Sequence, residues 1–135
     1  MNGAISGGCA CGQVRYELKS RAYDVGWCHC RTCQRVSGSP AMVFASVPPQ
    51  DFVLTEGTDK VRTFKSSSFG HRSFCGECGT PLLMKVDDQP ETVDFSVATL
   101  DEPNAVTPGF HIFYASRIAW FEPADTLKRH DRFRR

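Results

Sequence analysis

The seven cysteines of this 135-residue chain are grouped so closely that they predict metal binding. The groups are Cys9 and Cys11, then Cys28, Cys30 and Cys33, and finally Cys75 and Cys78. Closely spaced thiolates are typical ligands of a soft metal ion such as zinc. A closed structural zinc site takes four ligands, whereas a reactive site keeps one position open. Seven thiols therefore divide naturally into a site of four and a site of three.

Disulfide bonds are the competing explanation for a cysteine-rich chain. An odd number of cysteines leaves one unpaired, and positions i and i+2 of a strand are awkward to bridge within disulfide geometry. The segment from Met1 to Ser6 shows no secretory signal, and no apolar run approaches the roughly 18 residues that a membrane helix needs. We therefore predict a cytoplasmic protein whose thiols stay reduced and bind metal.

The two outer cysteine pairs fit one metal site. The segment Cys75–Gly79 has the spacing of a zinc knuckle, in which glycine permits positive φ and lets backbone N–H groups face sulfur. In Cys9–Cys11, an extended backbone would place both sulfurs on one side. A site made from both pairs would close a loop of roughly sixty residues and tie the fold together. Spacing alone leaves open a pairing of the knuckle with two central cysteines instead.

The central segment Cys28–Cys33 can surround one ion and leave its fourth position empty. A zinc ion with three thiolates would accept another soft ligand, such as an exogenous thiol, and convert it into a nucleophile. The alternative is a second structural site that a histidine closes. His71 and His111 are the candidates, because His29 lies between two ligands and should point away. The residue types favour neither possibility over the other.

Several residues beside the central cysteines could assist chemistry by stabilising an oxyanion. They are His29, Arg31, Gln34, Arg35 and Ser37. We expect the two arginines to neutralise the thiolates, and Gln34, Ser37 and Gly38 to cap a short helix. Trp27 is expected to shield the metal from water.

Short strands must position these residues. Polar and apolar residues alternate over 13–18, which places Val14, Tyr16 and Leu18 on one face of a strand. Further strands are predicted at 41–47, 52–54, 61–64, 72–74, 82–86 and 92–98. A hairpin-like turn is predicted at Glu56–Asp59, another turn at Asp87–Pro90, and one short helix at 31–36. The fold class is therefore mainly β, in one domain over residues 1–135.

The charge pattern and the aromatic residues suggest no further partner. The formal net charge of +1 gives no global field for nucleic acid or a membrane surface, so neither is expected as a partner. The basic tail over 128–135 is interpreted as a solvated chain end. Six phenylalanines are expected in the core or a pocket wall: Phe44, Phe52, Phe64, Phe69, Phe74 and Phe95.

Together these motifs resemble the glutathione-dependent formaldehyde-activating (Gfa-like) family. The resemblance is carried by Gly7–Tyr16, Cys28–Gln34 with Ser37 and Gly38, Arg72–Leu82, and the closing residues His111, Ile112, Trp120 and Phe121. It covers nearly the whole chain, and all seven cysteines fall into the family pattern.

The resemblance implies a mainly β, Mss4-like tent of small antiparallel sheets organised around a structural zinc. It implies two zinc ions per chain: a structural zinc held by Cys9, Cys11, Cys75 and Cys78, and a catalytic zinc held by Cys28, Cys30 and Cys33. The implied activity is that of a carbon–sulfur lyase acting on a glutathione–aldehyde adduct such as S-hydroxymethylglutathione. The alternative function is a non-catalytic zinc module that binds protein or nucleic acid.

Overall fold

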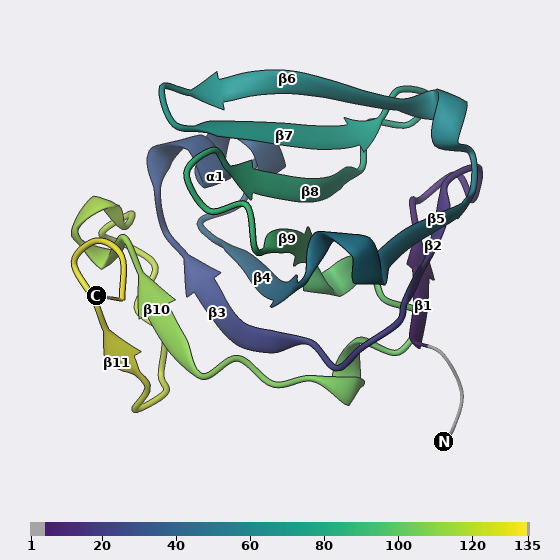
Figure 1. Cartoon of the computed structure of the whole chain (residues 1–135). Helices are drawn as coiled ribbons and strands as arrows, with labels where there is room; N and C mark the ends of the chain where they lie inside the picture. Colours follow the sequence, from purple (N-terminus) through teal and green to yellow (C-terminus); the bar gives the residue numbers. More distant parts are fainter. Residues whose placement is uncertain (1–4, 135) are drawn as a thin grey trace.

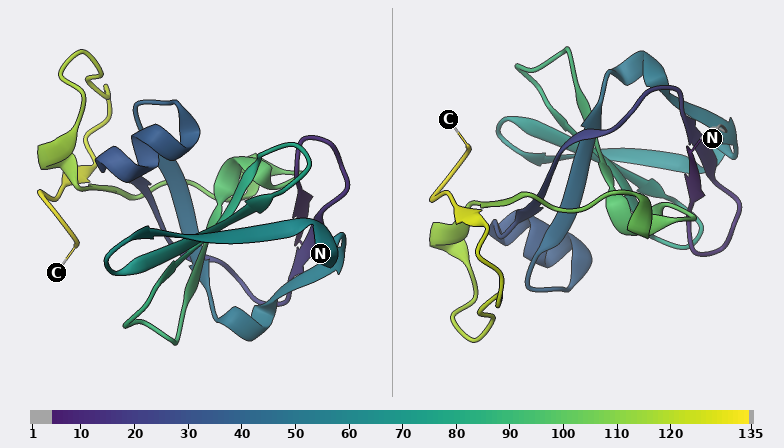
Figure 2. Two further views of the ribbon diagram at one scale, coloured as in Figure 1. Left: turned by 90° about the horizontal axis from the view of Figure 1, so that it is seen from above. Right: turned by 90° about the horizontal axis from the view of Figure 1, so that it is seen from below.

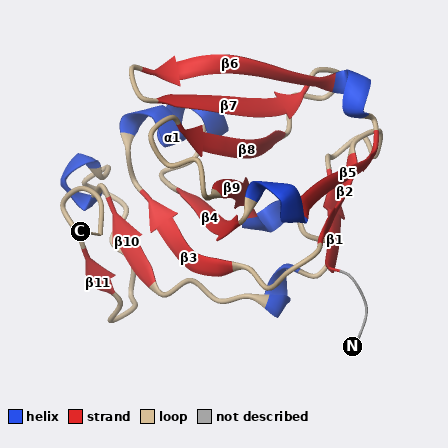
Figure 3. Ribbon diagram, viewed as in Figure 1, coloured by secondary structure: helices blue, strands red, loops and turns tan. Residues whose placement is uncertain are grey.

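The computed structural model describes residues 5–134, in which β-strands dominate (Figures 1 and 3). The strands in this range are β1 (Ile5–Gly8), β2 (Arg15–Leu18), β3 (Tyr23–Cys28), β4 (Met42–Val47), β5 (Phe52–Glu56), β6 (Val61–Ser67), β7 (Gly70–Cys75), β8 (Pro81–Val86), β9 (Val93–Ser96), β10 (Phe110–Ile112) and β11 (Lys128–Arg129). The α-helix is α1 (Arg31–Ser37), and single 3-10 turns lie at Pro49–Asp51, Thr58–Lys60, Val97–Thr99, Pro103–Ala105 and Tyr114–Ser116. The mainly β prediction is confirmed.

The ends of the predicted domain, Met1–Ala4 and Arg135, lie outside the described residues, and the single domain over 1–135 stays a prediction. Among residues 5–134, every helix is too short or too polar to span a lipid bilayer.

The strands form two sheets. The smaller sheet is antiparallel with the order β1-β2-β5, and the larger has the order β11-β10-β3-β4-β9-β8-β7-β6. In the larger sheet, each pair of neighbours along β3-β4-β9-β8-β7-β6 is antiparallel, whereas β10 runs parallel to both β3 and β11. The smaller sheet and the β10–β11 end lie on opposite sides of the molecule (Figures 1 and 2).

The main core joins the smaller sheet to the middle of the larger one. Val14, Tyr16 and Leu18 are all buried, which confirms the predicted alternation. The Tyr16 ring stacks on Phe52 of β5 with centroids 4.4 Å apart, and Phe95 of β9 is completely buried beside them. Burying side chains of this size contributes about 2 to 3 kcal/mol each. A second, smaller cluster forms around α1 and contains Cys28, Cys33 and Met42.

Most strand predictions are confirmed, with ends that differ by up to three residues. The predicted turn at Asp87–Pro90 does join β8 to β9, which pair antiparallel. The hairpin predicted around Glu56–Asp59 is wrong, because β5 pairs with β2 in one sheet and β6 pairs with β7 in the other. Gly57 has φ of 75°, and the Lys60 N–H donates to its carbonyl at 2.8 Å, which turns the chain from one sheet into the other.

Gly57→Ala should destabilise the protein more than Gly38→Ala. Both glycines have positive φ, 75° and 68°, which costs an alanine about 1 to 2 kcal/mol. A Cβ at Gly57 would also collide with the backbone oxygen of Gln13, whereas a Cβ at Gly38 would meet nothing within 4 Å. In urea unfolding we expect a loss of about 1 kcal/mol for Gly38→Ala and at least about 3 kcal/mol for Gly57→Ala. Equal losses would show that the chain around Gln13 yields without strain.

Candidate functional site

The first cysteine cluster joins two turns that are far apart in the sequence. Cys9 and Cys11 lie between β1 and β2, Cys75 ends β7, and Cys78 lies between β7 and β8. Their four sulfur atoms lie within 4.8 Å of one another, with 3.5 Å between Cys9 and Cys11 and 3.9 Å between Cys11 and Cys75. Sulfurs around a tetrahedral zinc ion are about 3.8 Å apart, given bonds of about 2.3 Å. The cluster therefore could hold a metal ion.

A turn, not a strand, brings the first two sulfurs together. The extended backbone predicted for Cys9–Cys11 is wrong, because β1 ends at Gly8 and the Gly12 N–H donates back to the Cys9 carbonyl at 3.1 Å. Gly12 has φ of 80°, and Gly79 has φ of 83° at the matching place in the other turn. Both turns thus depend on a glycine, as the knuckle spacing predicts.

Hydrogen-bond donors surround the sulfurs of this cluster. The Val14 N–H donates to Cys9 Sγ at 3.3 Å. Thr80 Oγ1 accepts from the Ala10 N–H and lies 3.2 Å from Cys78 Sγ, so its own proton is free to face that sulfur. The hydrogen bonds from Thr80 lower the pKa of Cys78 to about 5. Such donors stabilise the thiolate, which is the form that binds metal.

The second cysteine cluster is built where β3 ends and α1 begins. Cys28 is the last residue of β3, Cys30 is the N-cap of α1, and Cys33 lies in its first turn. Their sulfurs lie within 4.8 Å of one another. Cys30 Sγ accepts from the Cys33 N–H at 3.2 Å, the contact that a serine or aspartate commonly makes at an N-cap. All seven cysteines, each within the described residues, are free of disulfide bonds.

Around the second cluster, the contacts among the sulfurs favour the thiolate form at Cys30 and disfavour it at Cys28 and Cys33. Hydrogen bonds from Cys28 and Cys33 lower the pKa of Cys30 to about 2, and the same contact with Cys30 raises the pKa of Cys28. Arg72 of β7 donates from Nη2 to Cys33 Sγ at 3.3 Å, and this arginine is only 4% exposed. The contact with Cys28 lowers the pKa of Cys33, but the contact with Cys30 and burial outweigh it and raise this pKa to about 11. The positive charge of Arg72 opposes the rise.

Neither candidate histidine joins the second cluster in the part of the chain that the structure describes. His71 lies elsewhere, with Nδ1 2.7 Å from Asp87. His111 lies behind the cysteine loop, where its Nδ1 is 2.8 Å from Nε2 of His29. The structure therefore brings three cysteines together and leaves both histidines away from their sulfurs.

His29 and His111 instead form a buried chain that ends at Asp125. Both rings are completely buried, and His111 Nε2 lies 3.1 Å from each carboxylate oxygen of Asp125. Burial lowers the pKa of His29 to about 4, so this ring is neutral at pH 7. Because a carboxylate only accepts, neutral rings would donate in sequence from His29 to His111 and from His111 to Asp125. These hydrogen bonds connect the Cys28–Cys30 segment to β10 and to the segment that follows β10.

The other residues predicted beside the cluster mainly hold the loop in place. Gln34 donates from Nε2 to the His29 carbonyl at 2.8 Å, and Ser37 donates to the Cys33 carbonyl at 2.7 Å. Arg31 is exposed and bonds to Gln34, and Arg35 is exposed. Trp27 stacks beside His111 and takes no part in the cavity wall described next.

The sequence does not predict Arg72 or Asp125 as neighbours of this site, and it predicts His111 only as a possible fourth ligand of the second metal. Arg72 carried one usable signal, since a charged residue at an inward-facing strand position needs a buried partner. Asp125 carries no such signal, and the contact of His111 with His29 depends on how distant strands pair.

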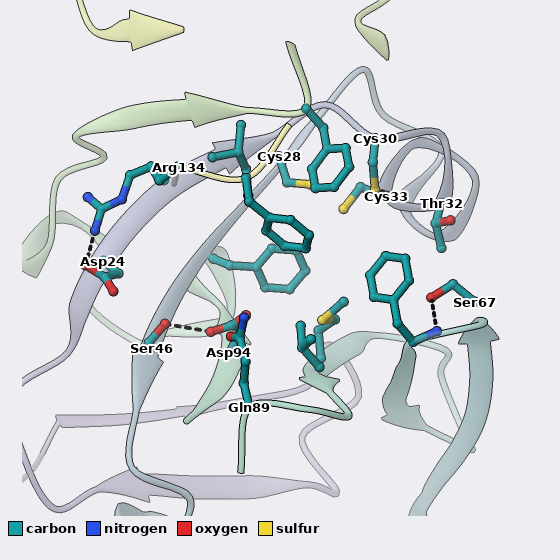
Figure 4. Close-up of a pocket in the computed structure, with 18 of the residues that line it drawn as sticks. Asp24, Cys28, Cys30, Thr32, Cys33, Ser46, Ser67, Gln89, Asp94 and Arg134 are labelled. Carbon is teal, nitrogen blue, oxygen red and sulfur yellow. Dashed lines mark hydrogen bonds and ion pairs between the residues drawn. The ribbon is translucent and has the colours of Figure 1, made fainter. Parts of the chain in front are cut away.

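The second cluster opens on a cavity of about 640 Å³ (Figure 4). Five phenylalanines line it: Phe44, Phe69, Phe110, Phe113 and Phe133. Figure 4 shows the three cysteines at one end and Asp94 across from them, where Asp94 accepts from Ser46 Oγ at 2.6 Å. None of the four cysteines of the first cluster is among the lining residues. A cavity of this size suits a small-molecule ligand.

Asp94→Asn should stabilise the protein at neutral pH. Burial raises the pKa of Asp94 above its ordinary value, and the negative charge of Asp24 adds to this rise. The hydrogen bond from Ser46 and the positive charges of Lys85 and Arg72 oppose it without cancelling it. A raised pKa means that the folded state holds the proton more tightly, so the charged carboxylate costs stability at any pH above the folded pKa. Asparagine keeps an acceptor for Ser46 and carries no charge.

Thermal unfolding of wild type and Asp94→Asn between pH 5 and pH 8 tests this sign. The variant should have the higher Tm at pH 8, and the difference should shrink as the pH falls toward the folded pKa of Asp94. A difference that grows on acidification would mean that the carboxylate contributes stability instead. Ser46→Ala serves as a control, because it removes the hydrogen bond and leaves the charge.

Comparison with known proteins gives a consistent match. The sequence model described as glutathione-dependent formaldehyde-activating enzyme matches residues 4–116. A Schizosaccharomyces pombe protein named as an uncharacterized lyase is 33% identical over 76 residues, covering 56% of this chain and 53% of that protein. A Halomonas elongata protein and a Podospora anserina protein both carry the provisional name glutathione-dependent formaldehyde-activating enzyme. The first is 23% identical over 125 residues, covering 87% of this chain and 80% of that protein. The second is 30% identical over 111 residues, covering 79% and 52%.

The chain thus spans about half the length of the S. pombe and Podospora relatives. Among solved structures, the crystal structure of a Rhodobacter sphaeroides protein superimposes with a TM-score of 0.60 at 24% identity, covering 76% of this chain and 91% of that one. This likeness shows a shared fold.

Proposed function

Since the chain belongs to the family of glutathione-dependent formaldehyde-activating enzymes, we propose that it is a zinc-dependent carbon–sulfur lyase. Its substrate would be the adduct of glutathione, or a similar small thiol, with an aldehyde such as formaldehyde. The observation that carries the proposal is the position of the three-cysteine cluster at one end of the 640 Å³ cavity. A metal site with three protein ligands beside a cavity can accept a fourth ligand from it.

The two clusters would then have different tasks. We assign a structural zinc to Cys9, Cys11, Cys75 and Cys78, and a second zinc to Cys28, Cys30 and Cys33. The sulfur spacing of the first cluster and the buried Arg72 beside the second support this division. When bound at the second cluster, zinc would keep an incoming thiol in its nucleophilic thiolate form at neutral pH.

The chain's own residues would bind and orient the reactants. In the synthetic direction the thiol first gives its proton to water. The substrate sulfur then forms a bond to the aldehyde carbon, the carbonyl electron pair moves to oxygen, and that oxygen takes a proton from water, so that no net proton is consumed. The reverse reaction breaks the same carbon–sulfur bond. Phe44, Phe69 and Phe113 line the cavity and would give the bound aldehyde an apolar wall. Arg72 supplies positive charge beside the sulfurs, which favours an anionic thiolate there.

A non-catalytic zinc module that binds nucleic acid through the basic tail is the alternative function. Arg129 pairs with Asp125 and Arg134 pairs with Asp24, each at 2.8 Å, so these arginines are engaged within the chain. Arg135 lies outside the described residues. Salt-sensitive nucleic-acid binding that disappears on deletion of residues 128–135 would favour this module over the lyase.

Native mass spectrometry of the purified, reduced protein tests the lyase proposal. We expect two zinc ions per chain and one bound glutathione, and no binding of S-methylglutathione at the same concentration, because its sulfur cannot become a thiolate. The rate of S-hydroxymethylglutathione formation should then exceed the uncatalysed rate. Two zinc ions without a glutathione adduct would contradict glutathione as the thiol substrate. A single zinc ion would contradict the assignment of a second metal site.

A further inference from the structure

Arg72 is a buried arginine that pairs with no carboxylate among residues 5–134. Its hydrogen-bond partners are both sulfur atoms: Cys33 Sγ lies 3.3 Å from Nη2, and Met42 Sδ lies 3.9 Å from Nη1. The Nε atom has no hydrogen-bond partner within the same range. Burying a guanidinium is costly unless its charge and its donors are matched. The side chain is therefore only partly satisfied by the chain itself.

Arg72 belongs to the wall of the cavity onto which the three cysteines open. Its guanidinium carbon lies 5.7 Å from the centroid of the Phe44 ring, which also lines this cavity. A guanidinium has five N–H donors in a rigid plane, and a thioether such as Met42 is a weak acceptor. The Nη1 donors, which the Met42 thioether engages only weakly, thus remain for an oxygen atom that enters the cavity next to the cysteine sulfurs.

The other arginines of the cavity wall are already engaged. Arg31 is exposed and bonds to Gln34, and Arg134 pairs with Asp24 at 2.8 Å. Arg72 is the cavity-lining arginine, among the described residues, that also contacts a cysteine of the second cluster.

We propose that Arg72 is a catalytic residue that donates a hydrogen bond to the substrate oxygen, which is the aldehyde oxygen in one direction and the hydroxymethyl oxygen in the other. This role rests on the lyase function proposed above. As the carbon–sulfur bond forms, the carbonyl electron pair becomes an alkoxide one carbon away from the substrate sulfur. A donor that contacts Cys33 is well placed to reach that oxygen. The guanidinium stays protonated throughout, and water supplies the proton that completes the hydroxyl.

Kinetics of Arg72→Lys test the catalytic role. Lysine keeps the charge that the thiolates need but lacks the planar set of donors. Loss of one donor to a developing oxyanion typically lowers kcat about 100- to 1000-fold. We therefore expect kcat to fall at least about 100-fold while the zinc content and the KM for glutathione stay within about threefold. Arg21→Lys makes the same change at an exposed position outside the cavity and should leave all three quantities unchanged.

Binding of two matched thiols tests the contact without any turnover. Thioacetate carries an oxygen one carbon away from its sulfur, as the adduct does, and ethanethiol has the same size without that oxygen. We divide the Kd of thioacetate by the Kd of ethanethiol, both measured by calorimetry. This ratio should be at least tenfold larger in Arg72→Lys than in wild type, because only thioacetate loses a hydrogen bond. The intrinsic difference in acidity between the thiols is common to both proteins and cancels in this cycle. In wild type, thioacetate but not ethanethiol should shift the side-chain N–H resonances of Arg72 in nuclear magnetic resonance spectra.

The outcomes separate this inference from the lyase proposal. An unchanged Kd ratio together with unshifted Arg72 resonances overturns the contact, whatever the activity. A changed ratio in a protein that does not join glutathione to formaldehyde removes these two compounds as the substrates and supports Arg72 as an oxygen-binding group. If Arg72→Lys loses zinc or fails to fold, the wild-type resonances decide: a shift with thioacetate alone supports the contact, and no shift overturns it.

Discussion

Cys75→Ser should leave the protein largely unfolded. Cys75 is completely buried in the main core and ends β7, and its cluster connects the β1–β2 turn to the β7–β8 turn. A structural zinc site contributes on the order of 10 kcal/mol or more to folding, which equals or exceeds the whole stability of a typical domain. Without the first metal, the smaller sheet would be held to the larger one by core packing alone. Circular dichroism and zinc analysis of the purified variant would measure the loss.

Cys78→Ser separates loss of the metal from damage to the core. Cys78 is exposed, so a serine there buries no hydroxyl group, yet it removes one of the same four sulfurs. Both variants should therefore lose the cooperative thermal transition. If Cys78→Ser keeps a wild-type Tm, the first cluster is not what joins the two sheets, and the failure of Cys75→Ser would come from the core alone.

Cys30→Ser should have the opposite signature: a folded protein with one zinc ion and no activity. Serine is among the preferred N-cap residues, so it can accept the Cys33 N–H in place of the sulfur and keep α1 in position. We expect stability within about 1 kcal/mol of wild type and formation of S-hydroxymethylglutathione at the uncatalysed rate. Native mass spectrometry should show the zinc count fall from two to one and the glutathione adduct disappear.

Cys30→Ala is the matched control for the helix cap. Alanine removes the sulfur and the cap together, so it should lose the same zinc ion and, in addition, about 1 kcal/mol of stability. If Cys30→Ser unfolds instead, the second cluster is a structural site and the proposal of an open metal position fails. Retention of two zinc ions in Cys30→Ser would mean that two cysteines suffice to hold the second ion.

The sequence was most informative where the signal is local. Alternation over Val14, Tyr16 and Leu18 predicted a buried strand face, because side chains of a strand point alternately to its two sides. The C-x-x-C spacing with glycine predicted the turn at Cys75–Gly79. The division of the cysteines into four and three was suggested by their number and by the family resemblance, and the structure gathers the sulfurs in those same two groups.

Features that depend on long-range pairing could not be predicted. The hairpin expected around Gly57 failed, because strand propensity does not say which strands pair. The backbone of Cys9–Cys11 is a turn that depends on Gly12 and not the predicted extended strand, yet it brings the two sulfurs together as an extended backbone would. The contact between Arg72 and Cys33 crosses 39 positions of the chain and arises only once β7 lies beside α1. The arrangement of site residues thus followed from topology rather than from any one motif.

The parallel pairing of β10 with β3 also bears on how fast the protein folds. It brings His111 into contact with His29, which lies 82 positions earlier in the chain. This contact supports the loop that carries the central cysteines. Closing so long a loop costs chain entropy before any contact rewards it, which slows folding in proteins with many non-local strand pairs. The loop should therefore gain this support late, on the scale of milliseconds to seconds, after the antiparallel neighbours β6, β7 and β8 have formed.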